Sequence, residues 1–231
     1  MAPDAAVHEP FALVFARPHP FGFLAGVALP PGRCAVGDEV VGRLHDDEAT
    51  YARALAGFRQ NEWVGGRLAA HVAARHLGIS GWSLLVGRSG EPTAPAAFSA
   101  SIAHKRTLAI ALVAHGANAG IGVDIEDDVA AARAIEDIVL AADERASIRR
   151  LRAPVQERAF VVAFSLKEAV YKALSARVDH VLAYREARVD FDIAGSPSVT
   201  MRVDGTAVQP RVDLVLDRHG RHVITAVKVR P

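Results

Sequence analysis

The stretch AGIGVDIEDD, residues 119–128, constrains the fold more than any other part of this chain. Apolar residues alternate in it with a glycine and two acids, Asp124 and Glu126. Successive side chains of a strand point to opposite faces, so we expect a strand whose apolar residues face the core while Asp124 and Glu126 converge on one exterior spot. Like charges on one face repel. The pattern therefore indicates a positive partner, either a basic side chain or a bound cation.

Composition narrows the class of protein without identifying it. The 231 residues are 51% hydrophobic and 23% charged, which is typical of one large globular domain or two small ones. A formal net charge of +1 gives no support for nucleic-acid or membrane binding. The single Cys34 excludes an intramolecular disulfide and a cysteine-rich zinc site. The segment MAPDAAVHEP lacks the features of a signal peptide, and the apolar runs fall short of the roughly 20 residues that cross a bilayer. We expect a cytoplasmic protein.

Hydrophobic periodicity predicts strands, helices and strands, followed by helices and strands again. Residues 1–45 contain two or three predicted strands, and residues 46–78 form one long helix or two consecutive ones, with Gly65 and Gly66 as a break or a close-packing point. The later segments are strands with a Pro/Gly-rich loop (82–114), two short helices (127–151), one longer helix (155–176) and an antiparallel meander (179–231).

This order predicts an α+β fold that resembles a sandwich. The segments HKRTLAIALV and RHVITAVKV each close one half of the chain after a turn, which indicates a weak internal duplication. We expect two similar α+β halves of about 110 residues, residues 1–118 and 119–231, that meet near Asn118.

The segment FSLKEAVYKAL, residues 164–174, places Glu168 and Lys172 on one side of a helix. A surface ion pair worth about 0.3–0.5 kcal/mol is the simplest interpretation. However, the helix is apolar over most of its circumference, which predicts burial on several sides. A buried Lys-Glu-x-x-x-Lys cluster needs partners, and a site for a metal and a phosphate would supply them.

Two further segments carry positive charge. SIAHKR, residues 101–106, places His104, Lys105 and Arg106 in a predicted turn, where they form either a solvated turn or a phosphate cradle. FRQNEWVGGRLAAH, residues 58–71, puts Arg59 and Arg67 on a predicted helix, where a solvated basic face is the simpler interpretation.

The order SIAHK, GVDIE and FSLKEAVYK resembles the signature of the 4′-phosphopantetheinyl transferases. The larger single-chain type, found in siderophore and peptide antibiotic pathways (the surfactin and enterobactin-synthase kind), is the better match. The segments FRQNEWVGGRLAA and GRSGEPTAP extend the resemblance, which covers roughly residues 46–174. Ala103 and Lys105 depart from the family pattern, because small hydroxyl or thiol residues commonly flank the histidine there; Lys105 adds a cation instead.

The resemblance implies a pseudo-dimer in one chain with the active site in the cleft between the halves. It implies Mg²⁺ bound by acids, coenzyme A as co-substrate, an apo acyl or peptidyl carrier protein as acceptor, release of 3′,5′-ADP, and a functional monomer. The implied roles are Mg²⁺ binding for Asp124, Glu126 and Glu168, contact with the coenzyme A phosphates for His104, Lys167 and Lys172, and contact with the 3′-phosphoadenosine end for Arg67 and Arg59. From its charge and its place beside His104, we expect Lys105 to bind coenzyme A as well.

Within this reading Asp124, Glu168 and Lys172 are the predicted catalytic residues, and Glu168 is our hypothesis for the base that takes the serine proton. Two alternatives remain open. One is a Mg²⁺-dependent phosphohydrolase, in which water replaces the carrier serine. The other is a non-catalytic module that binds coenzyme A or a carrier protein.

Overall fold

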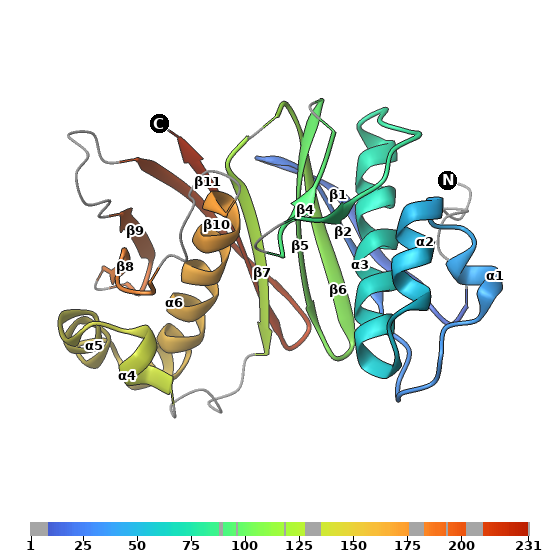
Figure 1. Ribbon diagram of the computed structural model, residues 1–231. Helices are drawn as coiled ribbons and strands as arrows, with labels where there is room; N and C mark the ends of the chain where they lie inside the picture. The colour runs from blue at the N-terminus through green and yellow to red at the C-terminus, as the bar shows by residue number, and fades with distance from the viewer. Residues whose placement is uncertain are drawn as a thin grey trace. The chain divides into compact units, whose positions relative to one another are not determined.

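The computed structural model describes residues 9–87, 90–95, 97–117, 119–127, 135–175, 183–192, 194–201 and 210–230. The chain divides into two compact units, Met1–Ala119 and Gly120–Pro231. Each unit contains an antiparallel sheet packed against one long helix (Figure 1), which confirms the α+β fold class. None of the helices in the described ranges combines the length and the apolar character needed to span a membrane.

Four antiparallel strands in the order β1-β2-β6-β5 form the sheet of the first unit. The apolar run LAIALVA forms most of β6 and is buried on both faces, as expected for a central strand. The elements of this unit are β1 (Ala12–His19), β2 (Gly22–Ala28), α1 (Asp38–Val41), α2 (Asp46–Arg53), α3 (Gly57–His76), β3 (Leu85–Val86), β4 (Pro92–Thr93), β5 (Phe98–Lys105) and β6 (Leu108–His115).

Helix α3 packs on this sheet through two glycines. A Cβ atom at Gly65 would lie 2.1 Å from Cδ2 of Leu29, and one at Gly66 would lie 2.8 Å from Cγ2 of Ile102. The helix continues through both positions, so these glycines mark close packing and not a break. The chain from Asp46 forms two consecutive helices, α2 and α3.

In the second unit the sheet order is β10-β11-β7, and α6 packs against β7 and β11 (Figure 1). The prediction of one continuous meander is wrong, because β8 and β9 form a separate two-stranded sheet and β11 pairs with β7. The elements are β7 (Ile121–Asp127), α4 (Glu136–Val139), α5 (Ala142–Arg149), α6 (Ala153–Leu174), β8 (Ala187–Phe191), β9 (Pro197–Met201), β10 (Arg211–His219) and β11 (His222–Arg230).

The two units share a connection pattern. The eight-residue helix α2 precedes the long helix α3 in the first unit, and the eight-residue helix α5 precedes α6 in the second. The strand order β2-β6-β5 corresponds to β7-β11-β10. In the first unit, β2 precedes the helices and pairs with the last strand, β6, whose other edge pairs with β5. In the second unit, β7 precedes the helices and pairs with the last strand, β11, whose other edge pairs with β10.

Gly122 marks a close approach between β7 and α6. A Cβ atom there would lie 1.8 Å from the carbonyl oxygen of Ala169 and 2.8 Å from the backbone nitrogen of Ala173. We expect Gly122→Ala to lower the free energy of unfolding by about 3 kcal/mol, since backbone must move to admit the methyl group. Urea denaturation measures this. Gly37→Ala is the control, because its nearest atom would be Cγ of Glu39 at 3.8 Å; equal losses at both positions would contradict the packing argument.

Candidate active site

Asp124 and Glu126 lie on the face of β7 that α6 covers. Gly122 shares this face, and it is this residue whose Cβ position falls on the backbone of α6. Asp124 is only 5% exposed and Glu126 is half-buried. The expectation of an exterior spot is therefore wrong for Asp124. The helix covers the acidic face of the strand, and the apolar residues of the opposite face are buried as well.

The carboxylate of Asp124 is held by two side chains from α6. Lys172 donates from Nζ to Oδ1 at 2.7 Å, and the Ser165 hydroxyl donates to Oδ2 at 2.8 Å. Thr225 stands opposite Asp124 in the β7-β11 register, and its hydroxyl lies 2.8 Å from that of Ser165. The positive partner that the strand pattern requires is thus a basic side chain in this structure, which offsets the cost of burying the carboxylate.

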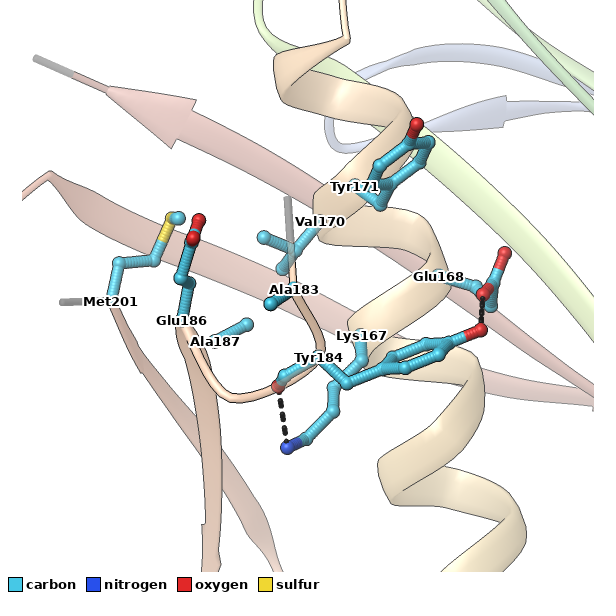
Figure 2. Close-up of a pocket in the computed structure, with 9 residues that line it drawn as sticks. All are labelled: Lys167, Glu168, Val170, Tyr171, Ala183, Tyr184, Glu186, Ala187 and Met201. Carbon is cyan, nitrogen blue, oxygen red and sulfur yellow. Dashed lines mark hydrogen bonds between the residues drawn. The ribbon is translucent and has the colours of Figure 1, made fainter. Parts of the chain in front are cut away.

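Glu168 lies one helical turn before Lys172 and accepts a hydrogen bond from the Tyr184 hydroxyl at 2.5 Å (Figure 2). Burial raises the pKa of Tyr184, and the hydrogen bond to Glu168 together with the negative charges of Glu168, Asp124 and Glu126 raises this pKa further. The negative charges of all three acids of the predicted site therefore act on the Tyr184 phenol. Strand β7 and helix α6 bring the three carboxylates into one region of the second unit.

The donor atoms of this region fit Mg²⁺, which prefers carboxylate oxygens and completes its shell with water and phosphate. Within the described residues, however, no three His, Cys, Asp or Glu side chains are grouped closely enough to hold a metal ion. Lys172 engages Asp124 and Tyr184 engages Glu168 instead. The set Asp124, Glu126 and Glu168 therefore has the ligand type that Mg²⁺ requires, and its role as a metal site stays a prediction.

Lys167 occupies a different environment from the one predicted. It is 2% exposed, and its ammonium group donates to Val139 O at 3.0 Å, to Glu144 Oε2 at 2.8 Å and to Tyr184 O at 2.9 Å. Burial lowers the pKa of Lys167, and the hydrogen bond and charge of Glu144 oppose that shift. An ammonium group has three donors, so these contacts leave none for coenzyme A, contrary to the prediction. The sequence pattern missed this because the partners come from three other segments.

In the first unit, three of the predicted coenzyme-binding residues line one pocket of about 260 Å³. Arg59 and Arg67 reach it from α3, and His104 reaches it from β5. Glu62 also lines the pocket, and its Oε1 lies 3.6 Å from Nδ1 of His104. Two guanidinium groups and an imidazole around one pocket form a set of donors suited to phosphate.

Arg67 is fixed within this pocket by its neighbours. Its Nε donates to the carbonyl oxygen of Leu84 at 2.8 Å, and its guanidinium carbon lies 3.5 Å from the centre of the Trp63 ring. Burial lowers the pKa of Arg67 to about 10, while the charge of Glu48 opposes this shift. The side chain therefore stays cationic at neutral pH and is held in one orientation.

Lys105 is not among the residues that line this pocket. His104 and Lys105 belong to β5, and the predicted turn begins only after them. Neighbouring residues of a strand point to opposite faces, so the strand that presents His104 to the pocket turns Lys105 away. The prediction that both contact the same phosphates is therefore not met by the local geometry.

A second pocket, of about 250 Å³, opens beside Glu168 in the second unit (Figure 2). Tyr184 forms part of its wall, and the sequence carried no signal for that residue. Ser165 lies within the segment FSLKEAVYKAL but had no role assigned, and Thr225 becomes visible only through the pairing of β11 with β7. The pocket is lined by Lys167, Glu168, Val170, Tyr171, Ala183, Tyr184, Glu186, Ala187 and Met201.

Two family models match this chain in succession. The model of the 4′-phosphopantetheinyl transferase N-terminal domain matches residues 46–114, and the model of the 4′-phosphopantetheinyl transferase superfamily matches residues 120–227. The chain therefore belongs to the 4′-phosphopantetheinyl transferase superfamily, and it carries both domains of the larger type.

Among curated proteins, enterobactin synthase component D of Salmonella typhimurium is 34% identical over 122 residues, which is 52% of this chain and 50% of the relative. The 4′-phosphopantetheinyl transferase PptT of Mycobacterium tuberculosis is 28% identical over 150 residues, which is 64% of this chain and 65% of the relative. The matched region thus spans about half to two thirds of these proteins.

Among solved structures, a holo-(acyl-carrier-protein) synthase from Bacillus anthracis in complex with CoA (3′,5′-ADP) overlaps with a TM-score of 0.38 at 21% identity, covering 48% of this chain and 95% of that one. The holo-[acyl-carrier-protein] synthase of Thermotoga maritima overlaps with a TM-score of 0.36 at 21% identity, covering 48% of this chain and 63% of that one.

Proposed function

We propose that this chain transfers the 4′-phosphopantetheine arm of coenzyme A to a serine of an apo acyl or peptidyl carrier protein, with Mg²⁺, and releases 3′,5′-ADP. Family membership supports the class of reaction. The observation that carries the proposal is the packing of α6, which bears Glu168, on the face of β7 that bears Asp124 and Glu126. Lys172 adds a cation to the same region.

The pocket of the first unit supports the binding of coenzyme A phosphates. Arg59, Arg67 and His104 would contact these groups, with Arg67 already fixed by Leu84 and Trp63. A preoriented guanidinium group loses little conformational freedom when it binds phosphate. We assign no coenzyme contact to Lys167, and Lys105 has no place in this pocket.

Asp124, Glu126 and Glu168 would hold the metal, which would supply positive charge to the diphosphate of coenzyme A. The serine oxygen forms a bond to the phosphorus of the pantetheine phosphate, and the bond from that phosphorus to the bridging oxygen breaks. Glu168 takes the serine proton. Lys172, which donates to Asp124 in this structure, donates to the departing phosphate and stabilises the charge that develops on it.

Mass spectrometry of an apo carrier protein incubated with the chain, coenzyme A and Mg²⁺ tests the proposal. A gain of one phosphopantetheine on serine is the expected result. Release of free phosphopantetheine from coenzyme A with the carrier unmodified would instead show a hydrolase. No change in either compound would show a binding module without catalysis.

A further inference from the structure

We propose that Tyr184 is a positioning residue for Glu168, and that a buried Glu144–Lys167 ion pair holds Tyr184 in place. The inference rests on the proposed function, because it concerns a residue assigned there to Mg²⁺ binding. It gives Lys167 a role that differs from coenzyme contact, and it adds Tyr184 to the site. Figure 2 shows the two contacts of Tyr184, from its backbone carbonyl oxygen to Lys167 and from its hydroxyl to Glu168.

Glu144 is the fixed end of this arrangement. It is 1% exposed, and its carboxylate accepts three hydrogen bonds from different parts of the unit. Ala141 N donates to Oε2 at 2.7 Å, which caps the start of α5, and Val189 N in β8 donates to Oε1 at 2.8 Å. Lys167 completes the set from α6 at 2.8 Å. A buried carboxylate with three donors is fully compensated and therefore rigid.

Lys167 connects this fixed carboxylate to Tyr184. Its ammonium group donates to the Tyr184 carbonyl oxygen at 2.9 Å, which fixes the backbone at that residue. The Tyr184 ring packs at 6.0 Å, centre to centre, from the ring of Phe164, with a tilt of 46°. With its backbone and ring both held, the phenol directs its hydroxyl to Oε1 of Glu168 at 2.5 Å.

The first unit also contains a buried glutamate with three hydrogen-bond partners. Comparing the two units shows which contacts belong to the fold and which belong to the predicted site. Glu48 is fully buried in α2 and accepts hydrogen bonds from Leu84 N at 2.7 Å and from His45 N at 3.3 Å. Its third partner is His71 Nε2 at 2.8 Å, 23 residues further along, the same separation as between Glu144 and Lys167. The buried glutamate with three partners is therefore a feature of the fold in both units. The second unit adds the Tyr184 hydroxyl on a predicted metal ligand.

The hydrogen bond has a defined consequence for metal binding. A carboxylate that coordinates a metal is usually oriented by a further hydrogen bond, and loss of that partner typically costs about 10–100-fold in metal affinity. Tyr184 bonds to Oε1 of Glu168, and loss of this bond would leave the carboxylate free to rotate.

Tyr184→Phe tests the inference, since it removes the hydroxyl and keeps both the ring and the backbone contact with Lys167. Titration calorimetry with Mg²⁺ alone should show affinity about 10–100-fold weaker than that of the wild type. Tyr171→Phe is the matched control, because Tyr171 lines the same pocket with its hydroxyl directed away from Glu168 (Figure 2). Its Mg²⁺ affinity should equal that of the wild type.

Unchanged Mg²⁺ affinity in Tyr184→Phe would overturn the inference and leave the proposed function standing. A wild type that binds no Mg²⁺ would overturn the metal part of the proposed function, and the inference with it. A double-mutant cycle of Tyr184→Phe and Glu168→Ala, measured by urea denaturation without metal, checks the contact itself, because each single change removes the hydrogen bond. Non-additive losses support the coupling of the two side chains, whereas additive losses contradict it.

Discussion

Glu168→Gln should lower kcat for holo-carrier formation by about 10²–10⁴-fold. The amide cannot take the serine proton, yet it retains an oxygen that can accept the hydrogen bond from Tyr184, so the fold should persist. The rate of carrier modification at saturating coenzyme A measures the effect, and circular dichroism checks the fold.

The matched control for this change lies on the same helix. Glu157→Gln replaces an exposed glutamate of α6 and should leave kcat within about twofold of the wild type, as surface substitutions usually have small effects. Near-normal turnover of Glu168→Gln with Mg²⁺ still bound would remove Glu168 as the base.

Lys167→Met should lower the free energy of unfolding by about 3–5 kcal/mol. The substitution leaves the carboxylate of Glu144 buried without its cation, and it leaves the carbonyl oxygens of Val139 and Tyr184 without their donor. Breaking a buried pair on one side is costly because the remaining charge cannot return to water. Urea denaturation monitored by fluorescence gives the value.

Lys228→Met provides the comparison for this loss. Lys228 is a half-buried residue of β11, so its replacement should change the free energy of unfolding by less than about 1 kcal/mol. Equal losses in the two variants would show that the Glu144–Lys167 pair is not the source of the effect.

The helices and strands followed from periodicity, but their pairing did not. The alternation in residues 119–128 predicts a strand, and β7 is found at Ile121–Asp127. Alternation also predicts the strands after residue 183, yet it carries no information about which strand each one joins. The pairing of β11 with β7 brings Thr225 opposite Asp124, and that contact depends on chain segments about a hundred residues apart.

The sequence predicted the acids of the site, but it did not predict the residues that surround Lys167. Asp124 and Glu168 follow from the motifs, and the need for a positive charge near Asp124 follows from electrostatics alone; the structure supplies it as Lys172. Lys167 was misjudged because a motif position gives no information on burial. Its partners Glu144 and Tyr184 lie on segments whose packing against α6 leaves no pattern in the sequence of that helix.

The proposed function depends on metal binding by Asp124, Glu126 and Glu168, so the most direct test is to locate the metal. Crystals of the chain grown with coenzyme A, and with Mn²⁺ in place of Mg²⁺, would give an anomalous difference peak at the ion. We expect one peak in contact with Asp124, Glu126, Glu168 and the coenzyme's diphosphate. A peak elsewhere, or coenzyme A bound while Lys172 still holds Asp124 and no ion lies among the three acids, would contradict it.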